Sequence, residues 1–166
     1  MHTELVARRR AAFHLGRIGG REGLPALAAA SGHPSPLVRY SICSGLRDCG
    51  LLEAVSVIEP MRDDDNLFVR RAACTAALSL GDAGAVDQLL AEMGTDSIDT
   101  GWNYGRNLFV TMSEYLGEEP LEEHETDLEA WRAWWADHRD SFNLEAAMSA
   151  SAEKRAERLS KPVSSE

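Results

Sequence analysis

Apolar residues recur at intervals of three and four along the first part of the chain, in blocks that glycines separate. The block from Val69 to Leu80 is rich in Ala and Leu at this spacing, which is typical of an amphipathic α-helix. After Gly81, a shorter block places four apolar residues on one helical stripe: Val86, Leu89, Leu90 and Met93. The pattern predicts a helical hairpin, in which the second helix packs against the first.

The same hairpin pattern occurs three times with a period of 31 residues. Self-similarity at a fixed period of about 20 to 50 residues is typical of stacked repeats. We therefore expect an all-α fold, an α-solenoid of about three helical hairpins over residues 1–94, with units near 1–34, 35–65 and 66–94. Five columns repeat without a gap: Arg8, Arg39 and Arg70; Ala11, Ile42 and Ala73; Gly19, Gly50 and Gly81; Leu24, Val55 and Val86; Leu27, Ile58 and Leu89.

The columns and the unit boundaries have physical roles. Equivalent residues of successive solenoid repeats lie beside each other, so the two columns of Leu, Val and Ile should form one continuous apolar seam. Ser35 before Pro36 is typical of a helix N-cap followed by proline at the first helical position. Gly50 and Gly81 suit left-handed helix exits.

Two units carry a Val-Arg pair followed three residues later by Ile-Cys or Ala-Cys, at Val38–Cys43 and Val69–Cys74. A glycine, a helix of Val and Leu and an acidic linker such as Asp63–Asp65 come with this pattern. Over residues 5–94 it resembles the short HEAT-like repeat of phycobilisome lyases and of many bacterial HEAT-repeat proteins. The resemblance implies an armadillo-type solenoid that binds other proteins, or a bilin lyase that holds a tetrapyrrole.

The column of Arg8, Arg39 and Arg70 has two interpretations. Each guanidinium bonds acidic or carbonyl groups of the neighbouring linker and forms a structural ladder, or the column is a basic stripe that grips an anion. We favour the ladder, because this arginine is typically structural in the family that the chain resembles and Asp65 lies nearby in sequence. Arg9 and Arg71, two periods apart with Tyr40 at the equivalent position between them, support the stripe.

The 31-residue period is lost after Met93. The spacing of apolar residues predicts a helix over 103–116, which an acidic loop over 118–125 follows. Thr126 and Glu129 form a capping box that begins another helix. We expect residues 95–143 to form a cap that folds as one unit with the repeats, and residues 144–166 to form a weakly helical or disordered tail.

The last predicted helix is rich in tryptophan, and it resembles the ending that follows the last repeat of many bacterial HEAT-repeat proteins. A solenoid must cover the open side of its final hairpin, and large indoles suit that purpose. The alternative is a protein-binding patch. We predict a structural cap made by Trp131, Trp134 and Trp135.

Candidate chemistry is sparse in this sequence. Cys43 and Cys74 occupy equivalent positions and are expected to be small buried hydrophobes, and no CxxC pair occurs. The five histidines are scattered, with no pair at the spacing of a metal site. No nucleophile elbow, phosphate loop or paired acid and base is present. We therefore predict no catalytic, cofactor-binding or metal-binding residues, and no cofactor.

Acidic side chains outnumber basic ones by 27 to 17, which disfavours an extended nucleic-acid surface. The imbalance is local: residues 1–94 carry 10 basic and 11 acidic side chains, whereas residues 95–143 carry 3 and 12. No window approaches the roughly 20 apolar residues that a membrane span needs, and no signal peptide is recognisable. We expect a soluble, cytoplasmic protein.

These features favour a non-catalytic scaffold or adaptor that binds another protein of unknown identity through the row of second helices. The alternatives are a bilin lyase-like or chaperone-type protein, a HEAT-like nucleic-acid-binding protein, and an acidic inhibitor or immunity partner. The sequence fixes neither the partner nor the oligomeric state. Candidate partner-binding residues are Pro25, Ala26, Ser56, Val57, Asp87 and Gln88 on the second helices, and Glu118, Glu119, Glu122 and Glu123 in the acidic loop.

Overall fold

The computed structural model describes residues 2–47, 49–93 and 128–143, and within these ranges the secondary structure consists of helices and turns without strands. The chain divides into two compact units, residues 1–92 and residues 93–166. The division falls near the predicted end of the repeats at residue 94. That residues 1–143 fold as one unit stays a prediction.

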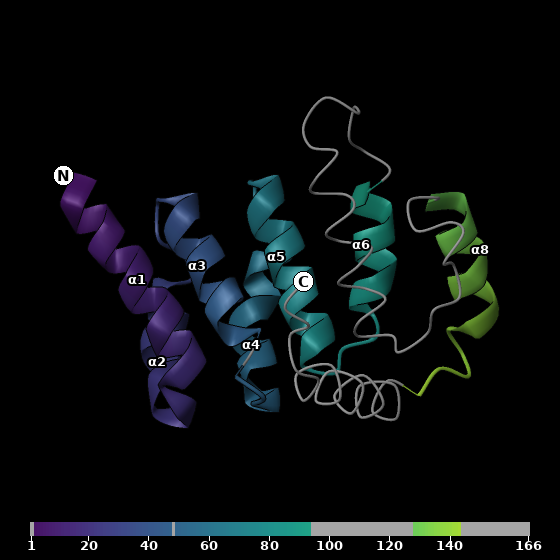
Figure 1. Ribbon diagram of the computed structural model, residues 1–166, viewed down its shortest axis with the longest axis horizontal. Helices are drawn as coiled ribbons and strands as arrows, with labels where there is room; N and C mark the ends of the chain where they lie inside the picture. The colour runs from purple at the N-terminus through teal and green to yellow at the C-terminus, as the bar shows by residue number, and fades with distance from the viewer. Residues whose placement is uncertain (1, 48, 94–127, 144–166) are drawn as a thin grey trace, which may run out of the picture. The chain divides into compact units, whose positions relative to one another are not determined.

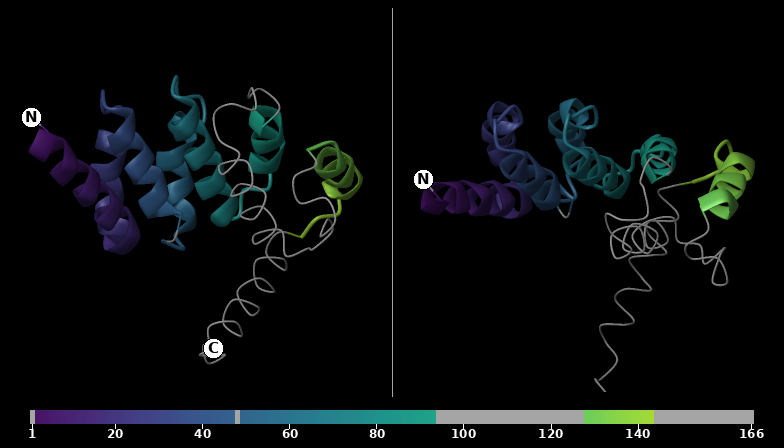
Figure 2. Two further views of the ribbon diagram at one scale, coloured as in Figure 1. Left: turned by 45° about the horizontal axis from the view of Figure 1, so that its top comes forward. Right: turned by 90° about the horizontal axis from the view of Figure 1, so that it is seen from above.

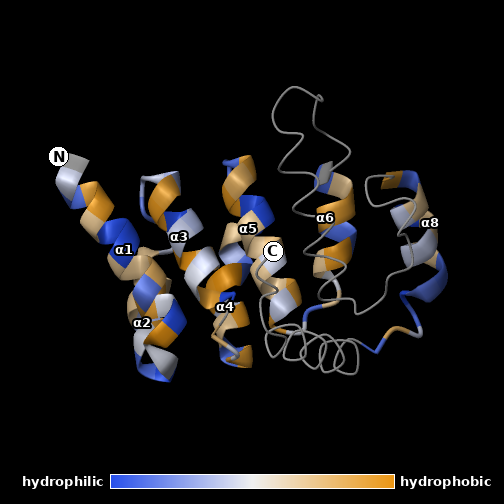
Figure 3. Cartoon of the chain, viewed as in Figure 1, coloured by the Kyte–Doolittle hydropathy of each residue, from blue (hydrophilic) through white to orange (hydrophobic). Residues whose placement is uncertain are grey.

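The first unit is an α-solenoid of helical hairpins, as the repeat pattern predicted. Its first helices lie side by side in chain order, α1 against α3 and α3 against α5, while α2 and α4 form a second row (Figures 1 and 2). Both hydrophobic and hydrophilic residues occur along each of these helices, as expected of amphipathic elements (Figure 3). The helices are α1 (His2–Ile18), α2 (Gly20–Ala30), α3 (Pro36–Leu46), α4 (Val55–Ile58), α5 (Leu67–Ser79) and α6 (Ala85–Met93).

The second helix of the middle repeat is much shorter than the pattern predicted. Only α4 is α-helical, and it lies between two 3-10 turns, η1 (Leu52–Ala54) and η2 (Glu59–Met61). Pro60, which cannot donate a backbone hydrogen bond, lies in η2 directly after α4. Because η1, α4 and η2 follow one another without a gap, residues 52–61 still form the second half of the hairpin.

The core of the first unit follows the predicted apolar columns. Leu27, Ile58 and Leu89, which occupy one column, are all fully buried. In the neighbouring column Val86 is buried, while Leu24 and Val55 are only half-buried. The column of Leu27 therefore forms the core. The column of Leu24 contributes to the core less evenly than expected.

Glycines control both the turns and the closest helix contact. Gly81 directly follows the C-cap of α5 with a φ of 101°, which confirms the predicted left-handed exit. Gly50 is left-handed as well, with a φ of 67°, but it lies in the linker, because α3 already ends at Leu46. Gly16 on α1 faces Gly45 on α3, and a Cβ on Gly45 would collide with the carbonyl oxygen of Phe13. The two glycines thus allow α1 and α3 to approach closely.

The second unit is described only over α8 (Leu128–His138) and the residues that follow it. Trp131 and Trp135 are buried, and Trp134 is half-buried, with its ring stacked on His138 at 4.8 Å between centroids. The predicted helix is confirmed, whereas a tryptophan cap over the repeats stays a prediction. The predicted helix over 103–116, the acidic loop with Glu118, Glu119, Glu122 and Glu123, and the tail over 144–166 lie outside the described residues.

Candidate binding surfaces

The arginine column joins neighbouring repeats through a network of hydrogen bonds. The Nε and Nη2 atoms of Arg39 donate to the two carboxylate oxygens of Asp64 at 2.6 and 2.7 Å. Nη2 also donates to Asp65 at 2.8 Å, and Nη1 donates to the carbonyl oxygen of His33 at 2.7 Å. Arg39 thus fixes the linkers on both sides of its repeat.

Arg70 repeats this arrangement one period later. Its Nη1 donates to the carbonyl oxygen of Asp64 at 2.8 Å, the equivalent of the bond from Arg39 to His33. Its Nε donates to Glu92 on α6 at 2.7 Å. The guanidinium groups of Arg39 and Arg70 are therefore occupied by carboxylates and carbonyls, which is the geometry of a ladder.

Arg8 differs from the other members of its column. Its side chain is 56% exposed and forms an ion pair with Glu4 on the same helix. Its Nη1 lies 3.3 Å from Nε2 of His33, the residue equivalent to Asp64. The backbone N–H of Ser35 points at Nδ1 of the same ring. A neutral imidazole has one acceptor nitrogen, so only one of these two contacts is a hydrogen bond.

The ladder determines the protonation of Asp64. Burial opposes ionisation of this carboxyl, but hydrogen bonds from Arg39 and from the Asn66 backbone outweigh it and hold the pKa of Asp64 below its usual value. The partner guanidinium responds in the opposite direction, because its bonds to Asp64 raise the pKa of Arg39. Both groups therefore stay ionised at neutral pH.

The predicted surface on the second helices is less available than the sequence suggested. Val57 is 4% exposed and belongs to the core, so it cannot contact a partner. The side chain of Gln88 accepts from Arg62 Nε at 2.9 Å and donates to the Arg62 carbonyl oxygen at 2.7 Å. The exposed members of the predicted set are Pro25, Ala26, Ser56 and Asp87, which are small or acidic.

A different surface carries two of the four exposed large apolar residues of the described repeats, whereas the other two, Ile18 and Leu52, lie at the end of α1 and in η1. Leu37 and Phe68 occupy equivalent positions on α3 and α5 and are 45% and 47% exposed. Val6, their equivalent on α1, lines a pocket of about 470 Å³ between α1 and α3. We call this exposed side of α1, α3 and α5 the first-helix face.

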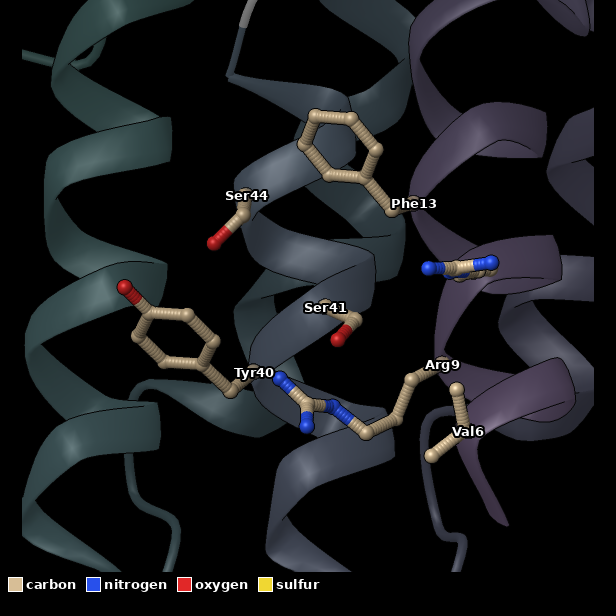
Figure 4. Close-up of a pocket in the computed structure, with 7 residues that line it drawn as sticks. Val6, Arg9, Phe13, Tyr40, Ser41 and Ser44 are labelled. Atoms are coloured by element: carbon tan, nitrogen blue, oxygen red, sulfur yellow. The ribbon is translucent and has the colours of Figure 1, made fainter. Parts of the chain in front are cut away.

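Basic and aromatic side chains line the pocket on the first-helix face (Figure 4). Arg9, Arg10 and Phe13 come from α1, and Tyr40 comes from α3 together with two serines. The equivalent positions of Arg9, Tyr40 and Arg71 in the sequence indicated a surface of this kind. The sequence does not predict the distance between α1 and α3, on which the pocket depends. Arg71 itself is buried and donates to the Glu92 carbonyl oxygen at 3.1 Å.

Cys43 and Cys74 have the character of core residues, whereas Cys49 is only half-buried. Burial raises the pKa of the Cys43 thiol to about 12 and that of Cys74 to about 11, so both thiols are protonated at neutral pH. The sulfur of Cys43 lies 3.6 Å from that of Met61. Among the residues that the structure describes, no group of three or more His, Cys, Asp or Glu side chains has the arrangement of a metal site.

Comparison with known families agrees with this geometry. Residues 2–79 match the family described as HEAT repeats. The match lies within the first unit, whose helical hairpins are therefore similar to HEAT repeats. No curated protein and no solved structure matches the chain. Within the described ranges, no helix has the length and apolar character needed to cross a membrane.

Proposed function

We propose that this HEAT-like array is a non-catalytic scaffold or adaptor that binds another protein through its first-helix face. The observation that carries the proposal is the placement of Leu37 and Phe68, two large exposed apolar residues in the same register on adjacent helices. Stacked repeats offer extended surfaces of this kind to partner chains. Burial of both side chains by a partner would remove apolar area from water, which is the dominant favourable term in association.

The first-helix face supports this function better than the row of second helices does. The residues that contribute most of the binding free energy at protein interfaces are enriched in Trp, Tyr and Arg, and Tyr40 and Arg10 lie on the first-helix face. The exposed second-helix residues Pro25, Ala26, Ser56 and Asp87 offer little aromatic or large apolar area. Leu52 in η1 is exposed as well, but the equivalent residues of the other repeats are Arg21 and Ala83, so it belongs to no apolar row.

The proposal has no enzymatic step. The two buried thiols are protonated and therefore unsuited to act as nucleophiles. Bilin lyase-like or chaperone-type activity, and inhibition through the acidic loop, remain predictions from the sequence.

The described charges disfavour a nucleic-acid surface on the repeats. Phosphate binding requires available Lys or Arg side chains, because affinity comes from the phosphates that they neutralise. In the arginine column, Arg39 pairs with Asp64 and Asp65, and Arg70 pairs with Glu92. The column therefore does not present a continuous row of available cations.

The proposal is tested by affinity capture from an extract of the source organism, with quantitative mass spectrometry as the readout. We compare the full-length chain with a Leu37→Ser, Phe68→Ser double variant. Both side chains are exposed, so the substitutions should leave the core intact. We expect the amount of captured partner to fall at least about tenfold in the double variant, because the burial of two large apolar side chains by the partner is lost.

A second-helix variant, Ser56→Lys with Asp87→Lys, is the matched control, since both positions are exposed. It should retain the partner at the level of the unsubstituted chain. Loss of the partner in this control alone would assign binding to the second helices. Recovery of the chain alone, even after crosslinking, would contradict the protein-binding function.

A further inference from the structure

The pocket on the first-helix face contains an arginine, Arg9, that has no counterion among the described residues. The Arg9 side chain extends from α1 toward α3 and ends beside Tyr40 (Figure 4). In the part of the chain that the structure describes, the buried Nε of Arg9 has no hydrogen-bond partner. A buried donor without a partner costs free energy that an incoming acceptor recovers.

A second cation lies at the same pocket. Arg10 is exposed, and no carboxylate of the described residues pairs with it or with Arg9. The only acidic residue of α1 is Glu4, which is bonded to Arg8, and α3 contains no acidic residue. The electrostatic field at this pocket is therefore positive, unlike that around Arg39, where aspartates neutralise the guanidinium.

Apolar groups adjoin these two cations. Phe13 and Val6 on α1 and Tyr40 on α3 form walls of the pocket, and the exposed Leu37 belongs to the same face. A volume of about 470 Å³ suits one or two side chains and lies within the usual range of single-ligand pockets, roughly 300–1,000 Å³. The complementary ligand has a carboxylate beside an apolar group.

From this geometry we infer that the pocket between α1 and α3 binds an acidic peptide segment of the partner protein, in which Asp or Glu neighbours a Leu, Phe or Trp residue. The carboxylate bonds the guanidinium groups of Arg9 and Arg10, and the apolar side chain packs on Phe13 and Tyr40. This inference rests on the proposed protein-binding function and assigns the chemistry of its partner.

An acidic peptide fits this surface better than a nucleic acid does. Nucleic-acid backbones need a track of several cations, because each phosphate contact contributes to the affinity. Here the positive charge is local to Arg9 and Arg10, and the next repeat offers Tyr40 at the position equivalent to Arg9. A single carboxylate with an apolar neighbour uses both the cations and the aromatic walls.

The test uses the full chain and a library of fluorescein-labelled peptides in which Asp or Glu flanks one Leu, Phe or Trp. Each peptide is paired with a counterpart in which every acidic residue is replaced by its amide. Fluorescence anisotropy should select acidic peptides over their amide counterparts, and the preference should weaken as salt rises. Arg9→Gln and Arg10→Gln should each weaken binding of the selected peptide at least about tenfold, since each removes a charge-assisted hydrogen bond.

The matched control is Arg17→Gln, which changes an exposed arginine of the same helix that does not line the pocket. It should bind the selected peptide as the unsubstituted chain does, and urea unfolding should show that all three variants are folded. Arg10→Gln keeps the test valid if Arg9→Gln fails to fold, because Arg10 is exposed.

Equal binding of acidic and amide peptides would overturn the inference, and so would unchanged binding in both pocket variants. Tighter binding of a single-stranded oligonucleotide, weakened equally by Arg17→Gln, would also overturn it. Light scattering could instead show a molar mass in solution that rises with protein concentration and is lower for Arg9→Gln. This result would assign the pocket to a second copy of the chain. The two proposals fail separately. If the Leu37→Ser, Phe68→Ser variant loses the captured partner while Arg9→Gln and Arg10→Gln keep it, protein binding stands and acidic recognition falls.

Discussion

Arg8 and Arg39 occupy equivalent positions in adjacent repeats, but their surroundings differ. The Arg39 side chain is 11% exposed and reaches two aspartates and a backbone carbonyl, whereas Arg8 is largely exposed and reaches a glutamate one turn away. The contribution of a repeated residue is therefore set by the partner that the next linker supplies. A column of equivalent arginines in the sequence predicts where an interaction between repeats forms, but not how strong that interaction is.

The difference has one chemical origin. Residue 64 is an aspartate, whose oxygens accept from Arg39 and from the backbone N–H of Asn66 at the same time. Residue 33 is a histidine that meets Arg8 and the Ser35 N–H in the same way. A neutral imidazole can accept from only one of them. The first rung of the ladder is consequently the weak one.

Removal of Arg39 should have the largest effect. Arg39→Ala leaves Asp64 buried without its guanidinium, and breaking such a pair costs about 3 kcal/mol in the free energy of unfolding. The equivalent change, Arg8→Ala, removes an exposed ion pair and should cost less than about 1 kcal/mol. Urea unfolding of the full chain, followed by circular dichroism, measures both.

Arg39→Lys is a sharper version of the same experiment, because it retains the charge but not the two parallel hydrogen bonds to Asp64. It should fall between the unsubstituted chain and Arg39→Ala. Equal losses for Arg8→Ala and Arg39→Ala would contradict the difference between the two rungs.

The stability of the chain in acid should also depend on the pair that Arg39 forms with Asp64. Because the pKa of Asp64 is lowered in the folded state, the unfolded chain binds more protons near pH 4, and stability rises with pH there. The contribution of Asp64 is present above its unfolded pKa of about 3.9 and is lost as pH falls through the lower folded value.

Asp64→Asn removes this titration. We expect the variant to be less stable than the unsubstituted chain near pH 7 and the gap to narrow as pH falls below about 4. Urea midpoints measured from pH 3 to pH 7 give the comparison. A gap that stays constant across this range would mean that Asp64 titrates alike in the folded and unfolded chains.

The helices, the core column and the arginine ladder were accessible to sequence reasoning because each follows a period. Leu27, Ile58 and Leu89 repeat at 31 residues and are all buried. The acidic linker pointed to the ladder through Asp65, although Asp64 makes the shorter, two-bonded contact with Arg39. Periodicity places residues on a column, and the exact partner depends on the linker conformation.

The binding surface was less accessible, because it depends on details that break the period. The helix α4 is shorter than the pattern predicted, and Val57 lies in the core instead of on the surface. Gln88 is engaged by Arg62, which lies 26 residues earlier in the chain. The pocket beside Arg9 is lined by residues of both α1 and α3, so it depends on how these two helices pack, which no local pattern predicts.

The smallest expected effect comes from repairing the weak rung. His33→Asp places a carboxylate opposite Arg8 at the position equivalent to Asp64, where it can also accept from the Ser35 N–H as Asp64 does from Asn66. Because Arg8 is more exposed than Arg39, the gain in the free energy of unfolding should be about 0.5 to 1 kcal/mol. The double variant Arg8→Ala, His33→Asp is the control that isolates the pair, and it should lose the gain. If His33→Asp stabilises the chain equally with and without Arg8, the carboxylate acts only on the Ser35 N–H, and the first rung cannot be rebuilt by its acceptor alone.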